Sequence, residues 1–321
     1  MKDAALRAQP ILDDAGEEFA RDLIGGLRGK LKEIPCKYFY DARGSELFDR
    51  ICRLPEYYQT RTETLLLRRH AGEIAQAMGP RVELIEFGAG SLAKVRILLD
   101  ALEEPQIYVP IDISGDYLLD VVVGLEEDYP EMTLKPVIAD FTQAIDLGAK
   151  AAGVSRRVGF FPGSTIGNFT RDAAVAFLRN AAQVLGGGGL LIGTDLVKDP
   201  AILHAAYNDS AGVTAAFNKN LLLRANRELG ANFDLNMFAH HACYNPVAMK
   251  IEMYLVSLVQ QTARVAGETI RFAEGEAIHT EDSHKYTIEG FTGLAEEAGF
   301  TLRKSWTDEA RLFAIHWLET R

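Results

Sequence analysis

The sequence contains few cysteines, and their spacing argues against the usual structural uses of this residue. Cys36, Cys52 and Cys243 are odd in number and widely separated, and no Cys-x-x-Cys pair occurs. This pattern favours buried thiols over a disulfide framework or a zinc site. The seven histidines include the adjacent pair His240 and His241 but no HExxH spacing. We therefore expect no bound metal ion.

Positive charge and long apolar runs are also scarce. Lys and Arg number 34 against 45 Asp and Glu, a net charge of −11, so a broad basic surface for nucleic-acid phosphates is not expected. No stretch approaches the roughly 20 apolar residues of a membrane helix, and residues 1–19 are too polar and acidic for a secretory signal. These features predict a cytoplasmic protein that binds neither nucleic acid nor membrane, and we expect it to be a monomer.

A phosphate-binding loop is missing as well. Four consecutive glycines occupy positions 186–189, but no Lys-Ser or Lys-Thr pair follows them, and the run precedes an expected strand instead of following one. This pattern favours a helix end and a turn.

From about residue 60 the sequence alternates helical segments with apolar, strand-like runs. A capping-box pattern from Thr60 to Glu63 predicts the start of a helix, and the apolar run 82–87 predicts a buried parallel strand. The series continues with helices at 91–102, 115–126 and 171–184 and strands at 107–113, 134–140, 157–164 and 189–196. Such a series predicts a mostly parallel sheet whose ligands bind beyond the carboxyl ends of its strands.

The alternation breaks near residue 197 and resumes near residue 287. Between these points lie long, polar helical stretches and two strand-like runs at 249–260 and 263–272, which predict a second, smaller unit. The chain then closes with a helix and two strands at 301–308 and 311–320, whose short connection demands antiparallel pairing.

These observations predict an α/β protein of two domains. A parallel sheet that ends in an antiparallel strand is typical of class I methyltransferases, which have a Rossmann-like sheet and bind S-adenosylmethionine. We expect this cofactor-binding domain at 62–196 together with 287–321. A smaller α+β substrate domain is expected at 1–61 together with 197–286.

The first strand of the series runs into a Gly-Ala-Gly turn. Gly88 and Gly90 permit a sharp turn and a close approach to a ligand, and the following helix presents free N–H groups. Glu86 precedes this turn, and Lys94 stands where it could reach the carboxylate of a cofactor. We expect these four residues to bind the cofactor, and we expect Ala89 to contact it through its backbone.

Acidic residues also follow the next two strands. Asp112 is placed to accept hydrogen bonds from ribose hydroxyls, and Asp140 could accept one from an adenine amine while the ring of Phe141 lies beside the base. The spacing of Gly88, Gly90 and Ala93 also fits the dinucleotide fingerprint, so an NAD-dependent oxidoreductase is the alternative. Glu86 ahead of the glycines, the Asp140-Phe141 pair and the antiparallel last strand favour S-adenosylmethionine.

Six further runs fall outside these generic motifs. They lie at 38–63, 160–170, 193–199, 206–220, 251–255 and 280–286. On these runs the sequence closely resembles the histidine Nα-methyltransferases of ergothioneine biosynthesis, in a family that also includes fungal enzymes methylating an indole amino acid. The resemblance extends from about residue 20 to the C-terminus.

The resemblance implies an amino-acid site with two ends. The residues that it places around the substrate's amino and carboxylate groups are Tyr40, Gly163, Thr165, Asn168 and Tyr207. Those that it places at the imidazole end are Tyr57, Met253, Glu281 and Ser283. It implies that Asn168 and Tyr40 act in catalysis, and that Tyr40 also contacts the cofactor.

The chemistry of methyl transfer is consistent with these residue types. An in-line displacement needs a neutral amine held in alignment and no strong base; Asn168 could accept a hydrogen bond from that amine. Glu281 and Ser283, two positions apart on an extended segment, could together bind one imidazole N–H and reject substrates that lack it. We therefore expect stepwise Nα-methylation of L-histidine to the trimethylated betaine hercynine. One alternative is that the substrate is another aromatic amino acid, such as tryptophan. Another is that the protein binds its ligand without catalysing a reaction.

One run departs from the family pattern. Where actinobacterial members have GSGTSEK, this chain has GAGSLAK at 88–94, so a serine hydroxyl near the cofactor is replaced by Ala89. The imidazole-binding positions show no departure, which favours histidine over tryptophan.

Overall fold

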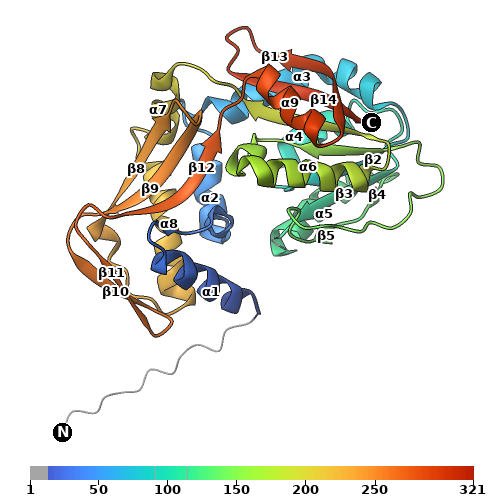
Figure 1. Ribbon diagram of the computed structural model, residues 1–321. Helices are drawn as coiled ribbons and strands as arrows, with labels where there is room; N and C mark the ends of the chain where they lie inside the picture. The colour runs from blue at the N-terminus through green and yellow to red at the C-terminus, as the bar shows by residue number, and fades with distance from the viewer. Residues whose placement is uncertain (1–13, 91, 114) are drawn as a thin grey trace. The chain divides into compact units, whose positions relative to one another are not determined.

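The computed structural model describes residues 14–90, 92–113 and 115–321 (Figure 1). These residues form two compact units. The smaller unit comprises residues up to Tyr57 together with Asp199–Ser283, and the larger unit comprises Tyr58–Lys198 together with His284–Arg321. The chain therefore passes from one unit to the other three times. The expectations that concern residues 1–13 and Ser91 fall outside the described residues.

An eight-stranded sheet forms the centre of the larger unit. Its strands follow the order β13-β14-β7-β6-β2-β3-β4, and β5 also pairs with β3. The strands β2 to β7 pair in parallel, whereas β14 pairs antiparallel with both β7 and β13. The bounds are β2 Glu83–Phe87, β3 Ile107–Asp112, β4 Thr133–Leu134, β5 Val137–Ile138, β6 Arg157–Phe161, β7 Gly189–Asp195, β13 Phe300–Thr307 and β14 Phe313–Thr320. The predicted class, a Rossmann-like sheet that ends antiparallel, is confirmed.

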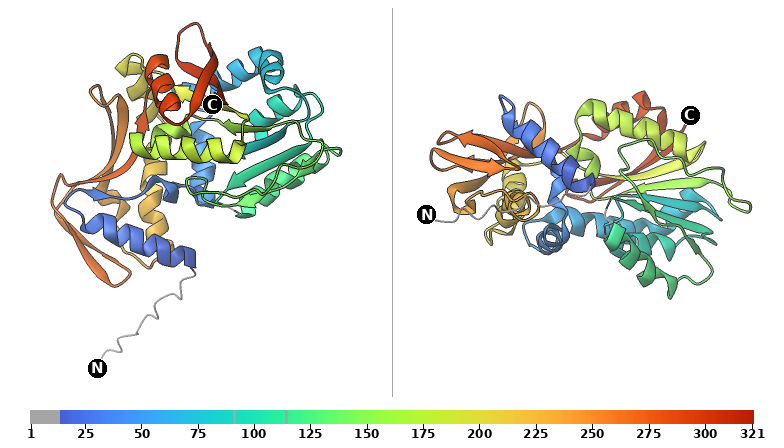
Figure 2. Two further views of the ribbon diagram at one scale, coloured as in Figure 1. Left: turned by 45° about the vertical axis from the view of Figure 1, so that its right-hand side comes forward. Right: turned by 90° about the horizontal axis from the view of Figure 1, so that it is seen from below.

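Helices cover both faces of this sheet, as the right-hand view of Figure 2 shows. They are α3 Tyr58–Met78, α4 Leu92–Leu99 and α5 Gly115–Glu126 on one face, and α6 Arg171–Leu185 and α9 Ile288–Glu297 on the other. Leu84 and Ile85 are neighbours on β2, yet they point to opposite faces of the sheet. Leu84 packs into the hydrophobic core beneath α3, α4 and α5, and Ile85 into the core beneath α6 and α9. Both faces of β2 are therefore buried, and its two glutamates, Glu83 and Glu86, are buried with the apolar residues between them.

Two local predictions in the larger unit are wrong. Helix α3 begins at Tyr58, two residues before the expected cap Thr60, and the side chain of Glu63 is buried inside the unit. The expected strand 134–140 consists of two short pieces, β4 and β5, on either side of Pro136. Proline has no N–H to donate, so it interrupts the ladder of hydrogen bonds. The glycine run behaves as expected, since Gly186 caps α6 in the left-handed conformation.

The smaller unit is built around a four-stranded sheet in the order β1-β12-β9-β8. These strands are β1 Lys32–Glu33, β8 Phe238–Asn245, β9 Lys250–Ser257 and β12 Ala277–His284. The helical elements of the smaller unit are α1 Asp14–Arg28, η1 Cys36–Phe39, α2 Ala42–Ile51, α7 Pro200–Tyr207, α8 Val213–Glu228 and η3 Leu235–Met237. The run 263–272, expected as one strand, belongs to a hairpin of β10 Gln261–Val265 and β11 Glu268–Phe272. Its turn at Ala266 and Gly267 has positive φ at both residues, the geometry that joins two strands through a two-residue loop.

A buried carboxylate lies beside all three places where the chain leaves or enters the larger unit. Asp195, at the end of β7, accepts hydrogen bonds from the Tyr58 hydroxyl at 2.8 and 2.9 Å and pairs with Lys198 at 2.5 Å and Lys285 at 2.9 Å. Burial disfavours a charged carboxylate, but the two ammonium groups outweigh it and hold the pKa of Asp195 below its ordinary value. One ionised side chain therefore ties together segments near residues 58, 198 and 285.

Replacing Asp195 with asparagine removes the carboxylate that pairs with the buried Lys198 and Lys285. We expect Asp195→Asn to lower the free energy of unfolding by about 3–5 kcal/mol, measured by urea denaturation at neutral pH. As a control, Glu297→Gln removes one partner of an exposed pair with Arg171 and should unfold like the wild type. Equal stability of Asp195→Asn and wild type would contradict this role.

Candidate active site

Three of the predicted acidic residues lie along the carboxyl edge of the parallel sheet. Glu86 is near the end of β2, Asp112 ends β3, and Asp140 follows β5. Because β2, β3 and β5 are hydrogen-bonded neighbours that run in the same direction, their carboxyl ends meet at one edge. This edge is where α/β sheets bind their ligands.

The Gly88–Gly90 turn closes this edge beside an aromatic ring. Gly88 has φ of +75°, and the N–H groups of Gly88 and Ala89 both donate to the carbonyl oxygen of Ile111, at 2.8 and 3.1 Å. A Cβ at position 88 would lie 3.3 Å from the ring of Phe141. Glycine therefore allows the backbone to approach this ring closely.

Glu86 is a buried acid with a perturbed pKa. Its side chain is 2% exposed and accepts a hydrogen bond from the Tyr108 hydroxyl. Burial, together with the negative charges of Glu63 and Asp112, raises the pKa of Glu86 to about 8, although Tyr108 and Lys94 oppose the shift. A carboxyl group in this state is suited to bind an ammonium group, which would favour its ionised form.

Asp140 is oriented by its own loop. Its Oδ1 accepts hydrogen bonds from the backbone N–H and the hydroxyl of Thr142, at 2.9 and 2.6 Å. The ring of Phe141 packs edge-on against Phe161 and Phe177. Both side chains are thus held at the sheet edge where the sequence predicts adenine.

The predicted residues Gly163, Thr165 and Asn168 share one turn after β6. This turn contains the 3-10 helix η2 Thr165–Asn168 and begins with Ser164 in the left-handed region at φ +57°. The backbone N–H of Asp195 donates to the Ser164 hydroxyl at 2.8 Å. A non-glycine residue held in this conformation is strained, and such strain persists where surrounding contacts fix it.

His284 supports the other end of the same turn. Its Nδ1 donates to the carbonyl oxygen of Gly167 at 2.9 Å, and the Tyr286 hydroxyl donates to that of Ile166 at 3.2 Å. A Cβ at position 167 would lie 2.8 Å from the backbone oxygen of His284. The turn that carries Asn168 is therefore fixed from both sides.

In the smaller unit, the other predicted substrate residues gather around one polar cluster. The hydroxyls of Tyr207 and Ser283 lie 2.7 Å apart, and the rings of Tyr57 and Tyr207 meet edge-on at 6.4 Å. The pKa values of Tyr40 and Tyr57 are raised well above the ordinary range, first by desolvation and then by neighbouring groups that include Glu281. These tyrosines therefore stay protonated at neutral pH.

Met253 and Phe48 complete the surroundings of this cluster. Met253 is buried on β9, and its carbonyl oxygen accepts a hydrogen bond from Thr280 on β12. Phe48 contacts the rings of both Tyr40 and Tyr57. Sequence reasoning missed Phe48, which reads as an ordinary apolar residue of α2.

Another residue missed by sequence reasoning is Glu63. It was interpreted as a helix cap, but its carboxylate binds Lys94 and the N–H of Gly163. A charged residue on the apolar side of an amphipathic helix was the available signal.

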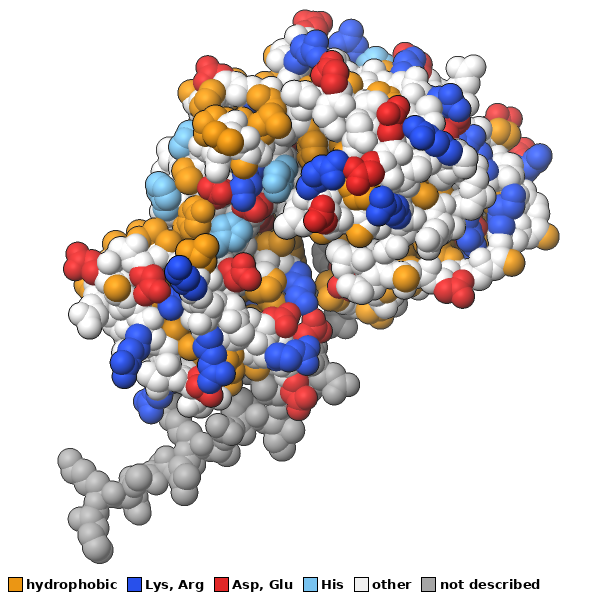
Figure 3. All heavy atoms as spheres, in the orientation of Figure 1, with side chains coloured by type: hydrophobic (Ala, Val, Ile, Leu, Met, Phe, Trp, Pro, Cys, Tyr) orange, Lys and Arg blue, Asp and Glu red, His pale blue; other side chains and the backbone are white. Residues whose placement is uncertain are grey.

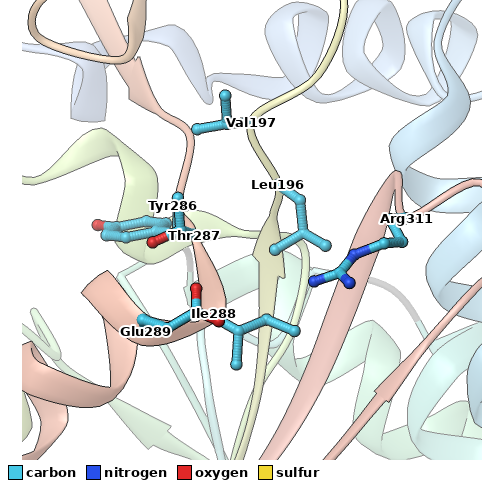
Figure 4. Close-up of a pocket in the computed structure, with 7 residues that line it drawn as sticks. All are labelled: Leu196, Val197, Tyr286, Thr287, Ile288, Glu289 and Arg311. Carbon is cyan, nitrogen blue, oxygen red and sulfur yellow. The ribbon is translucent and has the colours of Figure 1, made fainter.

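A cavity of about 150 Å³ lies in the larger unit beyond the end of β7 (Figure 4). It is lined by Leu196, Val197, Tyr286, Thr287, Ile288, Glu289 and Arg311. Figure 4 shows the Arg311 side chain directed toward Leu196 and Ile288. Its lining contains none of the predicted site residues.

On the face shown in Figure 3, Lys and Arg side chains are interspersed with Asp and Glu. Within the described ranges, no set of three or more His, Cys, Asp or Glu side chains is arranged to hold a metal ion. No helix in the described part of the chain has the length and apolarity to cross a membrane.

Known proteins resemble this chain over nearly all of its length. Residues 19–320 match a family described as histidine-specific methyltransferase, SAM-dependent. The chain is 42% identical to a histidine N-alpha-methyltransferase of Mycolicibacterium smegmatis, covering 94% of this chain and 95% of the relative. It is 40% identical to the protein of that name in Mycobacterium tuberculosis, with the same coverages. It is 30% identical to ergothioneine biosynthesis protein 1 of Neurospora crassa, over 86% of this chain and 32% of that protein.

The raised pKa of Glu86 offers a test of its predicted contact with the cofactor. If Glu86 binds the α-ammonium group of the cofactor, binding below pH 8 must expel a proton from its carboxyl group. Between about pH 6 and pH 8 the affinity for S-adenosylhomocysteine should then rise, by at most about tenfold per pH unit. Calorimetric titration in buffers of different ionisation enthalpy would detect the released proton.

Two variants on the same strand sharpen this test. Glu86→Gln should bind more weakly and lose the pH dependence. Glu83→Gln, which removes a buried partner of Arg157 at the opposite end of β2, should keep it. A wild-type affinity that does not change over this pH range would contradict the assignment of Glu86.

Proposed function

Since the chain belongs to the family of histidine-specific, S-adenosylmethionine-dependent methyltransferases, we propose that it methylates the α-amino group of L-histidine. Three successive transfers give hercynine for ergothioneine biosynthesis. The observation that carries this proposal is the family match over residues 19–320. The gathering of Tyr57, Tyr207, Glu281 and Ser283 in one polar cluster supports it.

The residues of the larger unit fit the parts of S-adenosylmethionine, whose sulfonium supplies the electrophilic methyl group. In this assignment Glu86 binds the ammonium group, Lys94 the carboxylate, and the Gly88–Gly90 backbone lies along the amino-acid portion. Asp112 binds the ribose hydroxyls, and Asp140 and Phe141 hold the adenine. The carboxyl edge of the sheet would thus form the cofactor-binding domain, and the smaller unit the substrate domain.

In the proposed mechanism hydrogen-bond donors and acceptors of the protein hold the histidine. Tyr40 and Tyr207 donate their hydroxyl hydrogens to the substrate carboxylate, and the raised pKa of Tyr40 keeps its hydroxyl protonated. In the first two transfers the Asn168 side-chain oxygen accepts a hydrogen bond from an N–H of the neutral α-amine. This contact directs the nitrogen lone pair at the methyl carbon, opposite to the departing sulfur. The proton released by the methylated amine passes to solvent. The tertiary amine of the third transfer has no N–H to donate and releases no proton.

Glu281 and Ser283 recognise the imidazole in this proposal. Tyr207 is bonded to Ser283 at 2.7 Å, so the hydroxyl that holds the substrate carboxylate also orients the residue at the ring end. A polar pair that binds the ring N–H favours histidine over an amino acid with a larger apolar ring.

Removal of the Glu281 carboxylate tests the substrate assignment. We expect Glu281→Ala to lower kcat/KM for L-histidine by about 10- to 100-fold, the effect of losing a charged hydrogen bond. Its selectivity should relax toward tryptophan and other aromatic amino acids. Initial rates with a panel of free amino acids, followed as S-adenosylhomocysteine release, measure both effects.

The matched control lies on the adjacent strand. Glu252→Ala removes a carboxylate that pairs with Lys250 at 2.9 Å and should leave histidine kinetics unchanged. If Glu281→Ala behaves like this control, Glu281 does not bind the imidazole. If the wild type methylates another amino acid and not histidine, the substrate is wrong.

A further inference from the structure

Glu63 connects two parts of the larger unit that are far apart in sequence. Its side chain on α3 is 1% exposed. Its Oε2 lies 2.5 Å from the Nζ of Lys94 on α4, and both carboxylate oxygens lie 2.9 Å from the backbone nitrogen of Gly163. One carboxylate is thus bound simultaneously to α4 and to the turn after β6.

The backbone of β7 provides the space for this carboxylate. A Cβ at position 193 would lie 2.2 Å from the Oε1 of Glu63, so only glycine leaves room for it. Lys94 is itself only 9% exposed. A buried pair of opposite charges contributes little to net stability, because desolvation offsets the attraction. Its retention at the active edge of the sheet therefore points to positioning.

The two partners of Glu63 belong to different halves of the proposed reaction. Lys94 follows the Gly88–Gly90 turn and is assigned to the cofactor carboxylate. Gly163 opens the turn that carries Thr165 and Asn168, which are assigned to the substrate amine. A displacement of the Glu63 carboxylate would therefore move a group on each side of the transferred methyl.

We propose that Glu63 is a positioning residue for methyl transfer, which orients the Lys94 ammonium toward the cofactor and fixes the turn that presents Asn168 to the amine. The inference rests on the proposed function for the roles of Lys94 and Asn168. In this role the negative charge of Glu63 orients the Lys94 ammonium, and the length of the Glu63 side chain lets its carboxylate reach the N–H of Gly163. Each requirement can be removed separately.

Glu63→Gln removes the charge and keeps the length. An amide oxygen in the place of Oε2 can still accept from both donors, but it carries no full negative charge for Lys94, and the NH₂ group then replaces the second acceptor beside the Gly163 N–H. We expect at least a tenfold increase in the Kd for S-adenosylhomocysteine and at least a tenfold decrease in kcat, because misplaced groups lose alignment. Glu63→Asp keeps the charge but is one methylene shorter, and it should lose less cofactor affinity than Glu63→Gln.

A double-mutant cycle separates positioning from general destabilisation. If Glu63 acts on the cofactor through Lys94, the Kd of Glu63→Gln/Lys94→Met should equal that of Lys94→Met alone. The double variant should retain the kcat loss that arises from the turn at Gly163. Glu83→Gln, another buried carboxylate lost from an ion pair, should lower the melting temperature without changing the Kd.

The results that would overturn the inference are distinct from a failure of the proposed function. A Glu63→Gln protein with wild-type Kd and kcat would overturn it, as would strictly additive losses of affinity in the double variant. If the wild type fails to methylate histidine, the proposed substrate is wrong. The cycle on S-adenosylhomocysteine affinity would still decide whether Glu63 positions Lys94.

Discussion

The attraction between the buried carboxylate of Asp195 and two lysines is the interaction on which the chain path depends. A chain that passes three times between two units must hold three segments together at the points of passage. Tyr58, Lys198 and Lys285 come from those segments and all bind Asp195. The backbone N–H of the same residue holds Ser164 in the strained turn. The fold and the position of Asn168 are therefore linked through one residue of β7.

A second buried charge network lies at the carboxyl edge of the sheet. Glu63, Lys94 and Glu86 are all nearly inaccessible to water, and low-dielectric surroundings strengthen the interactions among them. Burial raises the pKa of Glu86, whereas Lys94 opposes the shift. Such fixed charges need little reorganisation when a charged ligand binds, which is the property that methyl transfer requires of its cofactor site.

The order of elements in the larger unit could be predicted from sequence because each strand there is a short apolar run bounded by a helix. The antiparallel finish followed from the short connection between β13 and β14. The hairpin at Ala266 was not predicted, since alanine rarely adopts positive φ. The division of the strand at Pro136 could have been predicted from the missing N–H of proline.

For the site too, some residues could be predicted from the sequence pattern and others could not. The carboxylates at the ends of β2, β3 and β5 followed from strand direction, whereas the amino-acid site came from a family resemblance. The place of Glu63 on the apolar side of α3 was a local signal of burial, but its partners could not be assigned from it, because Lys94 and Gly163 are 31 and 100 residues away in the chain. Only the folded sheet brings them together.

The most direct test of the account is the position of the transferred methyl group. The purified protein would be incubated with L-histidine and S-adenosylmethionine carrying a ¹³C-labelled methyl, and the product examined by heteronuclear NMR. Every labelled methyl should be bonded to the α-nitrogen, with hercynine as the final product. Labelled methyl on a ring nitrogen, or histidine recovered without label from an enzyme that methylates another amino acid, would contradict it.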